Sequence, residues 1–261
     1  MEFAYSFAGM VVGFIVGLTG IGGGALMTPV LIVVFGIPPI TAVSTDLLYA
    51  AITKCGGTFS YAKKRLIEYK IVLLLLGGSI PGSLFTLYYL KGLGGLDAIE
   101  HLMNLTLGIS LVFTSVAVFL RNRIRAKALE WQDTKLARHG RRWRPAITLI
   151  TGIALGGLVT LSSVGAGALG TALLILLYPR LSMQAIVGTD LLHAVVLTAI
   201  AGAGHYEMGN VDLGLLAYLV IGSLPGVFLG SHLGARLSPK VMQPIMGSLL
   251  FAIGLRFVLA G

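Results

Sequence analysis

The stretch T19-G-I-G-G-G-A-L-M-T28 near the start of the chain returns as S162-S-V-G-A-G-A-L-G-T171 past its middle. Both copies lack charged residues and lie inside long apolar segments. Clustered glycines weaken a helix because they have wide backbone freedom and no side chain to pack. In membrane proteins, helices interrupted at membrane depth often form binding sites. The motif therefore predicts two broken helices within a bilayer.

The composition indicates an integral membrane protein. Of the 261 residues, 56% are hydrophobic and 11% are charged, and the mean hydropathy is +0.92. About 20 apolar residues are needed to cross a bilayer, and we count about eight such segments along the chain. The expected fold class is therefore an all-α integral membrane protein with several passes.

The repeat extends beyond the glycines and divides the chain into two related halves. V43-S-T-D-L-L48 matches V187-G-T-D-L-L192, and G78-S-I-P-G82 matches G222-S-L-P-G226. These blocks keep the order and nearly the spacing of the glycine motifs. We therefore expect residues 1–120 to form a first membrane repeat and residues 146–261 a second. Residues 121–145 join them as a basic cytoplasmic linker.

The first hydrophobic segment of each half is too long for an ordinary span. Residues 7–36 would form a helix of about 45 Å, against a hydrocarbon core of about 30 Å. A turn at residues 20–24 would instead give two arms of about 13 to 15 residues, each about 20 Å long. Such re-entrant hairpins give the halves opposite orientations, whereas complete crossings give parallel halves.

The distribution of Lys and Arg favours the inverted repeat. Cytoplasmic segments of membrane proteins are enriched in these residues. In the inverted arrangement the linker cluster shares the inner side with the following residues: Lys63, Lys64, Arg65, Lys70, Arg180, Arg236 and Lys240. Only Lys91 and Arg256 remain outside, together with the acidic Glu207 and Asp212. Parallel halves would move Arg180, Arg236 and Lys240 outside, so that arrangement stays open but fits less well.

Each glycine motif has the chemistry of an anion site. A helix that starts after a glycine turn presents free N–H groups and the positive end of its dipole, and hydroxyls nearby add donors. The alternative is close helix packing through small residues. The candidate substrate-binding residues are Thr19, Gly20, Gly22, Gly23, Gly24, Lys54, Ser162, Ser163, Gly165 and Gly167.

Ionisable residues inside the apolar segments are candidates for coupling or gating, since burying them in a membrane is costly. Asp46 and Asp190 occupy equivalent places in the repeat, whereas Lys54 corresponds to Thr198. His193 and His205 could titrate during proton-coupled transport. Structural roles are the alternative: an acid in the first turn of a helix interacts favourably with the positive end of the helix dipole, and the preceding Thr can cap the helix.

The sequence carries no sign of an enzyme or of a cofactor. It contains no nucleophile elbow, Walker loop or HExxH motif, and its single cysteine, Cys55, provides no metal-ligand cluster. The net charge is +9, but the positions of the basic residues are explained by membrane topology and do not form a nucleic-acid-binding face. We therefore expect no enzyme, no cofactor, no metal and no nucleic-acid partner, and transport that is secondary or passive.

The chain resembles the sulfite exporter TauE/SafE family of membrane transporters. The resemblance rests on G17-L-T-G-I-G-G-G24, on V-S-T-D and V-G-T-D, on N210-V-D and on the duplicated S-x-P-G, and it covers nearly the whole chain outside the linker. Membership implies a multi-pass carrier in the cell (inner) membrane, in many cases an exporter, of sulfur-containing anions such as sulfite, sulfoacetate, other organosulfonates or thiosulfate. The second copy departs from the glycine triplet, having Ala166 between Gly165 and Gly167, so the two motifs are expected to contribute unequally.

Two mechanisms remain open at this stage. A carrier would alternate access to a central site between the two glycine motifs, with proton coupling through the carboxylates or histidines. An anion channel would use the same amides but needs a continuous pore. The expected partners are the sulfur-containing anion and the membrane lipids.

Labelling at position 180 distinguishes the inverted from the parallel arrangement. We expect Arg180→Cys, in a chain with Cys55→Ala, to react with an impermeant maleimide from the cytoplasmic side, because the inverted repeat places this loop beside the basic linker. Intact cells and inside-out vesicles provide the measurement. Glu207→Cys is the matched control for the opposite side, and labelling of Arg180→Cys in intact cells would support parallel halves.

Overall fold

The computed structural model describes residues 2–19, 24–93, 95–132, 141–234 and 239–260. Within these ranges the chain is helical, without strands. The first half comprises α1 (Glu2–Thr19), α2 (Gly24–Val33), α3 (Pro39–Lys63), α4 (Tyr69–Gly92) and α5 (Leu96–Gln132). A short 3-10 helix (Arg141–Trp143) precedes the second half, which comprises α7 (Arg144–Ser162), α8 (Ala168–Leu177), α9 (Met183–Glu207), α10 (Leu213–Gly234) and α11 (Pro239–Ala260).

Each glycine motif separates a long helix from a short one. The first segment is divided into α1 with 18 residues and α2 with 10, and the second into α7 with 19 and α8 with 10. At 1.5 Å per residue these are about 27 Å and 15 Å long. The arms of about 13 to 15 residues expected from the sequence are therefore wrong. Helix α1 already begins at Glu2, and α2 and α8 are shorter than expected.

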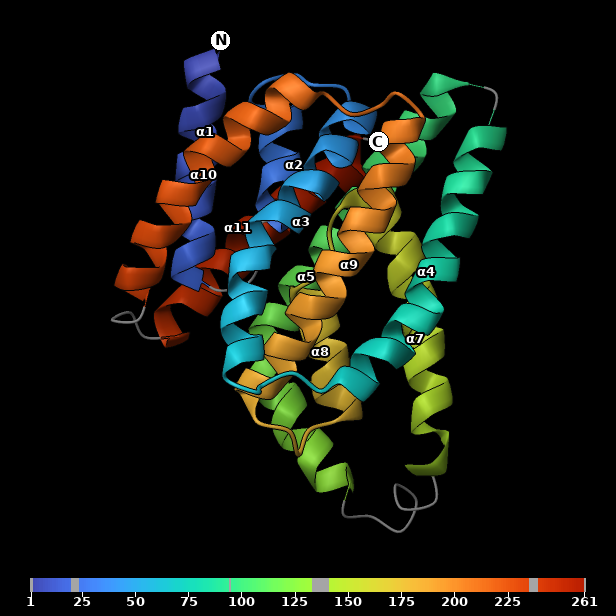
Figure 1. Ribbon diagram of the computed structural model, residues 1–261, viewed down its shortest axis with the longest axis vertical. Helices are drawn as coiled ribbons and strands as arrows, with labels where there is room; N and C mark the ends of the chain where they lie inside the picture. The colour runs from blue at the N-terminus through green and yellow to red at the C-terminus, as the bar shows by residue number, and fades with distance from the viewer. Residues whose placement is uncertain (1, 20–23, 94, 133–140, 235–238, 261) are drawn as a thin grey trace.

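Helices at corresponding places in the two halves have opposite directions in Figure 1. In Figure 1, α1 descends from the N-terminus, α2 rises, and α3 descends again. The equivalent α7 rises from the lower end, α8 descends and α9 rises. The same reversal relates α4 to α10 and α5 to α11: each of these helices is antiparallel to the helix at the corresponding place in the other half (Figure 1).

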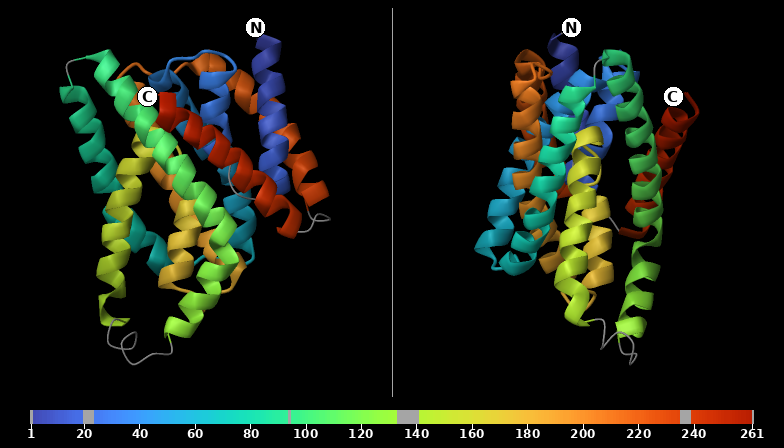
Figure 2. Two further views of the ribbon diagram at one scale, coloured as in Figure 1. Left: turned by 180° about the vertical axis from the view of Figure 1, so that it is seen from behind. Right: turned by 90° about the vertical axis from the view of Figure 1, so that its right-hand side faces the viewer.

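The halves are interleaved rather than placed side by side. The long helix α1 packs along α10 of the other half, and α7 packs along α4. The equivalent helices α3 and α9 pack together at the centre, and α5 crosses α11 on one face (Figure 2). Each half therefore buries its apolar surface mainly against the other half, and the core includes side chains from both.

The duplicated G-S-x-P-G blocks make this interleaving possible. A Cβ added at Gly78 would lie 2.0 Å from the carbonyl oxygen of Leu149 on α7. A Cβ at the equivalent Gly222 would lie 1.8 Å from the carbonyl oxygen of Ser6 on α1. Backbones of neighbouring membrane helices approach this closely where small residues line the contact.

The surface and the helix lengths fit a membrane environment. Five helices of the described part are long and apolar enough to span a bilayer, namely α4, α5, α7, α9 and α10. Large apolar side chains such as Phe85, Tyr88 and Phe228 are exposed on their outer faces. The protein is thus an all-helical, multi-pass membrane protein. Helix α5 continues to Gln132, so it includes the beginning of the segment expected as linker.

Gly78→Ala is expected to destabilise the protein by about 1–3 kcal/mol or more, since the methyl group would collide with the backbone of α7. The adjacent Gly77 has no atom within 4 Å of an added Cβ. Gly77→Ala should therefore be neutral or slightly stabilising. Thermal unfolding of the two purified variants in detergent measures the difference. Equal melting temperatures would contradict the close approach of α4 and α7.

Candidate functional site

The paired helices α3 and α9 present the two T-D dipeptides at the centre of the molecule. Thr28 on α2 donates its hydroxyl hydrogen bond to Asp46, and Thr171 on α8 donates to Asp190 Oδ2 at 2.9 Å. Both carboxylates are buried, and the second oxygen of each, Oδ1, has no hydrogen-bond partner among the described residues. Each short helix is thereby linked to the central helix of its own half.

The threonines of these dipeptides link the two halves. Thr45 Oγ1 accepts a hydrogen bond from the N–H of Asp212, at the start of α10, at 3.1 Å. Thr189 Oγ1 accepts from the N–H of Glu68, at the start of α4, at 3.0 Å. The expectation that these residues serve the start of their own helix is wrong, because α3 and α9 begin earlier, at Pro39 and Met183. Each threonine caps a helix of the opposite half.

The second glycine motif forms a tight turn between α7 and α8. Ser163 is left-handed, with φ of 56°, and Gly165 has φ of 117°. Ser162 Oγ accepts from the N–H of Val164 at 3.2 Å and donates to the carbonyl of Leu158 at 2.7 Å. This serine therefore stabilises the turn. The turn places the N-terminus of α8 at the centre of the molecule.

Lys54 crosses from the first half to this turn. Its Nζ donates a hydrogen bond of 2.7 Å to the carbonyl oxygen of Ala166, and the residue is only 6% exposed. The equivalent Thr198 on α9 donates instead to the carbonyl of Ala194 in its own helix. The cation is thus a feature of one half only, and it is held against the glycine motif of the other half.

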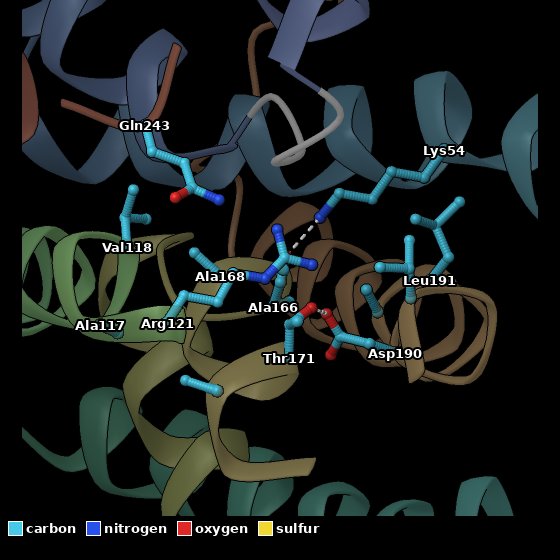
Figure 3. Close-up of a pocket in the computed structure, with 14 residues that line it drawn as sticks. Lys54, Ala117, Val118, Arg121, Ala166, Ala168, Thr171, Asp190, Leu191 and Gln243 are labelled. Carbon is cyan, nitrogen blue, oxygen red and sulfur yellow. Dashed lines mark hydrogen bonds between the residues drawn. The ribbon is translucent and has the colours of Figure 1, made fainter. Parts of the chain in front are cut away.

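A pocket lies beside this contact (Figure 3). It is lined by Lys54, Ala117, Val118, Arg121, Ala166, Gly167, Ala168, Thr171, Ala172, Val187, Asp190, Leu191, Ala194 and Gln243. Lys54 and Arg121 extend toward each other from α3 and α5, and the Thr171–Asp190 pair lies next to them (Figure 3). The pocket therefore combines two cations, one carboxylate and the first turn of α8.

Arg121 is the residue that sequence reasoning missed as part of a site. The sequence pattern places it in the basic linker, where its charge indicates which side of the membrane is cytoplasmic. In the structure it lies on α5, is partly buried, and its Nε has no hydrogen-bond partner among the described residues. The signal was the absence of Gly or Pro after Leu120, since residues 121–131 include several strong helix formers that continue the helix.

The other predicted site residues lie in different places. Gly167 and Asp190 line the pocket with Lys54, whereas Ser162, Ser163 and Gly165 shape the turn beside it. His193 Nε2 is hydrogen-bonded to Ser79 Oγ at 2.9 Å, and His205 Nε2 donates to the carbonyl of Thr160 at 3.0 Å. Gly20, Gly22 and Gly23 lie outside the described residues, as do the side chain of Thr19 and the surroundings of Gly24.

The described residues contain no cluster of three His, Cys, Asp or Glu that could hold a metal ion. The charged groups that come together are instead suited to an anion. Lys54 and Arg121 offer positive charge and hydrogen-bond donors, and backbone N–H groups at a helix start favour negative charge. The arrangement can bind a small oxyanion.

Comparison with known proteins supports the same class. The family model of the sulfite exporter TauE/SafE matches residues 5–257. The chain belongs to this family. It is 38% identical over 255 residues to the probable membrane transporter protein YjnA of Bacillus subtilis, covering 96% of this chain and 97% of the relative. It is 30% identical over 231 residues to YdhB of the same organism, also named a probable membrane transporter protein, covering 88% and 89%. No solved structure matches significantly.

In this TauE/SafE-family chain, Gly170 is the place where α8 meets the Asp190 carboxylate. A Cβ at Gly170 would lie 2.0 Å from Asp190 Oδ1, and the nearest atoms to it all belong to Asp190. The equivalent position in the first half is Met27, which is fully buried. Among the described residues, Asp190 of the second half lines the pocket, and Asp46 of the first half does not.

Gly170→Ala is expected to lower stability by about 1–3 kcal/mol, because the methyl group displaces the Asp190 side chain. In an Asp190→Ala background the same change should cost much less, since the opposing atoms are gone. A double-mutant cycle from thermal or denaturant unfolding measures this coupling. Additive effects would show that Gly170 and Asp190 are not in contact.

Proposed function

We propose that the protein is a secondary transporter of small sulfur-containing oxyanions across the cytoplasmic membrane. The observation that carries this proposal is the pocket at the second glycine motif, where Lys54 and Arg121 meet the start of α8. Two cations inside a chain that is only 11% charged are costly unless they serve a ligand or a partner. The family name and the names of the relatives support transport and a sulfur-containing anion.

We further infer that the halves form an inverted repeat. The opposite directions of equivalent helices in Figure 1 support it. So does the charge distribution: the α3–α4 connection with Lys64 and Arg65, the α8–α9 connection with Arg180, and the end of α5 all lie toward the lower end of Figure 1. Glu207 and Asp212 lie at the α9–α10 connection, toward the upper end. By the positive-inside rule, the lower end is cytoplasmic.

The size of the pocket favours a small substrate. The volume of the cavity is about 40 Å³, enough for roughly three or four water molecules at 10–15 Å³ each. Sulfite, with four heavy atoms, is of that size. Longer organosulfonates such as sulfoacetate would need the pocket to widen.

The difference between the two halves favours a carrier over a channel. On the side of the second half, Asp190 lines the pocket. On the side of the first half, Asp46 does not line this pocket, and the buried Met27 stands at the position equivalent to Gly170. A site that differs in this way between two related halves suits alternating access. With the lower end cytoplasmic, the part of α5 that lines the pocket leads toward the cytoplasmic linker.

Lys54→Met is expected to reduce transport about tenfold or more, since a hydrogen bond to a charged group is worth about 1.5–3 kcal/mol. The measurement is saturable uptake of radiolabelled sulfite or thiosulfate into proteoliposomes, with counterflow. Lys70→Met, at the exposed start of α4, is the matched control and should transport normally.

The same assay can reject the proposal. If intact, folded protein moves neither sulfite nor thiosulfate nor any sulfonate, the protein is not a transporter of these anions. Large single-channel currents in planar bilayers, without saturation or counterflow, would identify an anion channel instead.

A further inference from the structure

We propose that Asp190 and the transported anion share the two cations Lys54 and Arg121, so that the anion binds together with one proton on Asp190. This inference rests on the proposed function, because it concerns the same pocket. It goes further by assigning a proton that binds with the anion to one of the two repeated aspartates.

Asp190 is a buried carboxylate at the wall of the pocket. The residue is 1% exposed and lines the pocket together with Lys54 and Arg121. Its Oδ2 accepts a hydrogen bond from Thr171 Oγ1 at 2.9 Å, while Oδ1 has no hydrogen-bond partner among the described residues. A buried carboxylate oxygen without a donor is costly, so nearby positive charge must offset it. The available cations are the two that face the pocket.

The other groups around Asp190 do not replace these cations. From α5, one turn after Arg121, Arg125 donates to the carbonyl oxygen of Leu181 at 3.3 Å. From α9 itself, His193 is bonded to Ser79 on α4. From α11, Gln243 adds an uncharged amide to the pocket, and from α8 the polar contact is the Thr171 hydroxyl. Tyr61 lies about two turns beyond Lys54 on α3 and adds no cation.

The net charge of the pocket depends on whether Asp190 is protonated. With Asp190 ionised, the pocket carries two positive charges and one negative charge, for a net charge of +1. A dianion that entered would lie next to the carboxylate, and two like charges in a shared buried site cannot both persist without cost. When Asp190 takes up a proton, the net charge becomes +2 and matches the dianion. The proton comes from the solution and stays on the Asp190 carboxyl while the anion is bound.

The repeat supplies an internal comparison. Asp46 has the same place in its half and the same threonine bond, to Thr28. Asp46, however, does not line the pocket. Lys54 is directed toward Ala166, in the motif of the second half. In this state the linked proton therefore belongs to Asp190 alone.

Calorimetric titration of the purified full chain in detergent tests the inference. The probes are sulfate and thiosulfate, whose charge of −2 is constant between pH 5 and 8, so that their own titration cannot contribute. Measurements in two buffers of different ionisation enthalpy give the number of protons bound. We expect about one proton taken up per dianion, and an affinity that falls by up to about tenfold per pH unit where Asp190 is ionised.

Two variants separate the aspartates. Asp190→Asn should bind both dianions with little dependence on pH and without proton uptake, because the competing charge is gone. The matched Asp46→Asn should keep the proton uptake of the wild type. Arg121→Gln should weaken binding of the dianions more than binding of the monoanion methanesulfonate.

Each outcome is decisive. Wild-type binding of the dianions without proton uptake overturns the inference, whatever the variants do, and so does undiminished uptake in a folded Asp190→Asn protein. Loss of uptake in Asp46→Asn would overturn the assignment to the second half. If sulfite, sulfate, thiosulfate and methanesulfonate all fail to bind to the wild type at every pH, the proposed function itself fails. Binding of these anions without a linked proton leaves that function standing.

Discussion

Every feature of this molecule depends on one constraint, namely that backbone interrupted at membrane depth must be enclosed by protein. A hydrocarbon environment offers no hydrogen bonds to the amide and carbonyl groups that a broken helix releases. Between α7 and α8 the break is covered by α3, α5 and α9, and the carbonyl of Ala166 receives the Lys54 ammonium group. The chain therefore surrounds a polar turn with its two central helices instead of exposing it to lipid. A binding pocket beside this turn follows from that enclosure.

The interleaving of the two halves is the means of enclosure. If each half packed only against itself, its glycine turn would lie at its own surface. The exchange of long helices, with α1 on α10 and α7 on α4, places both T-D dipeptides at the common centre. The bonds from Asp212 and Glu68 to the threonines of the opposite half reinforce this arrangement. Glycines at the crossings permit it, because any side chain there would meet the backbone of the neighbouring helix.

The departures from the repeat are as informative as the repeat itself. The halves share the aspartates, the threonines that donate to them and the packing glycines. They differ at Lys54 against Thr198 and at Met27 against Gly170; Lys54 lines the pocket, and Gly170 lies against the Asp190 carboxylate that also lines it. Two symmetric halves could take two equivalent states of equal energy. A cation and an open carboxylate on one side provide a difference to which a ligand and a proton can respond.

The sequence by itself determined the fold class, the two related halves and the breaks at the glycine motifs. These follow from composition, from segment length against bilayer thickness and from duplicated blocks, all of which act locally along the chain. It also singled out Lys54 and Asp190, because ionisable residues are conspicuous in apolar segments. The lengths of the arms, the partners of Thr45 and Thr189 and the place of Arg121 were decided only by the tertiary structure. Which helix of one half packs on which helix of the other depends on contacts between residues far apart in the chain, and no local pattern encodes them.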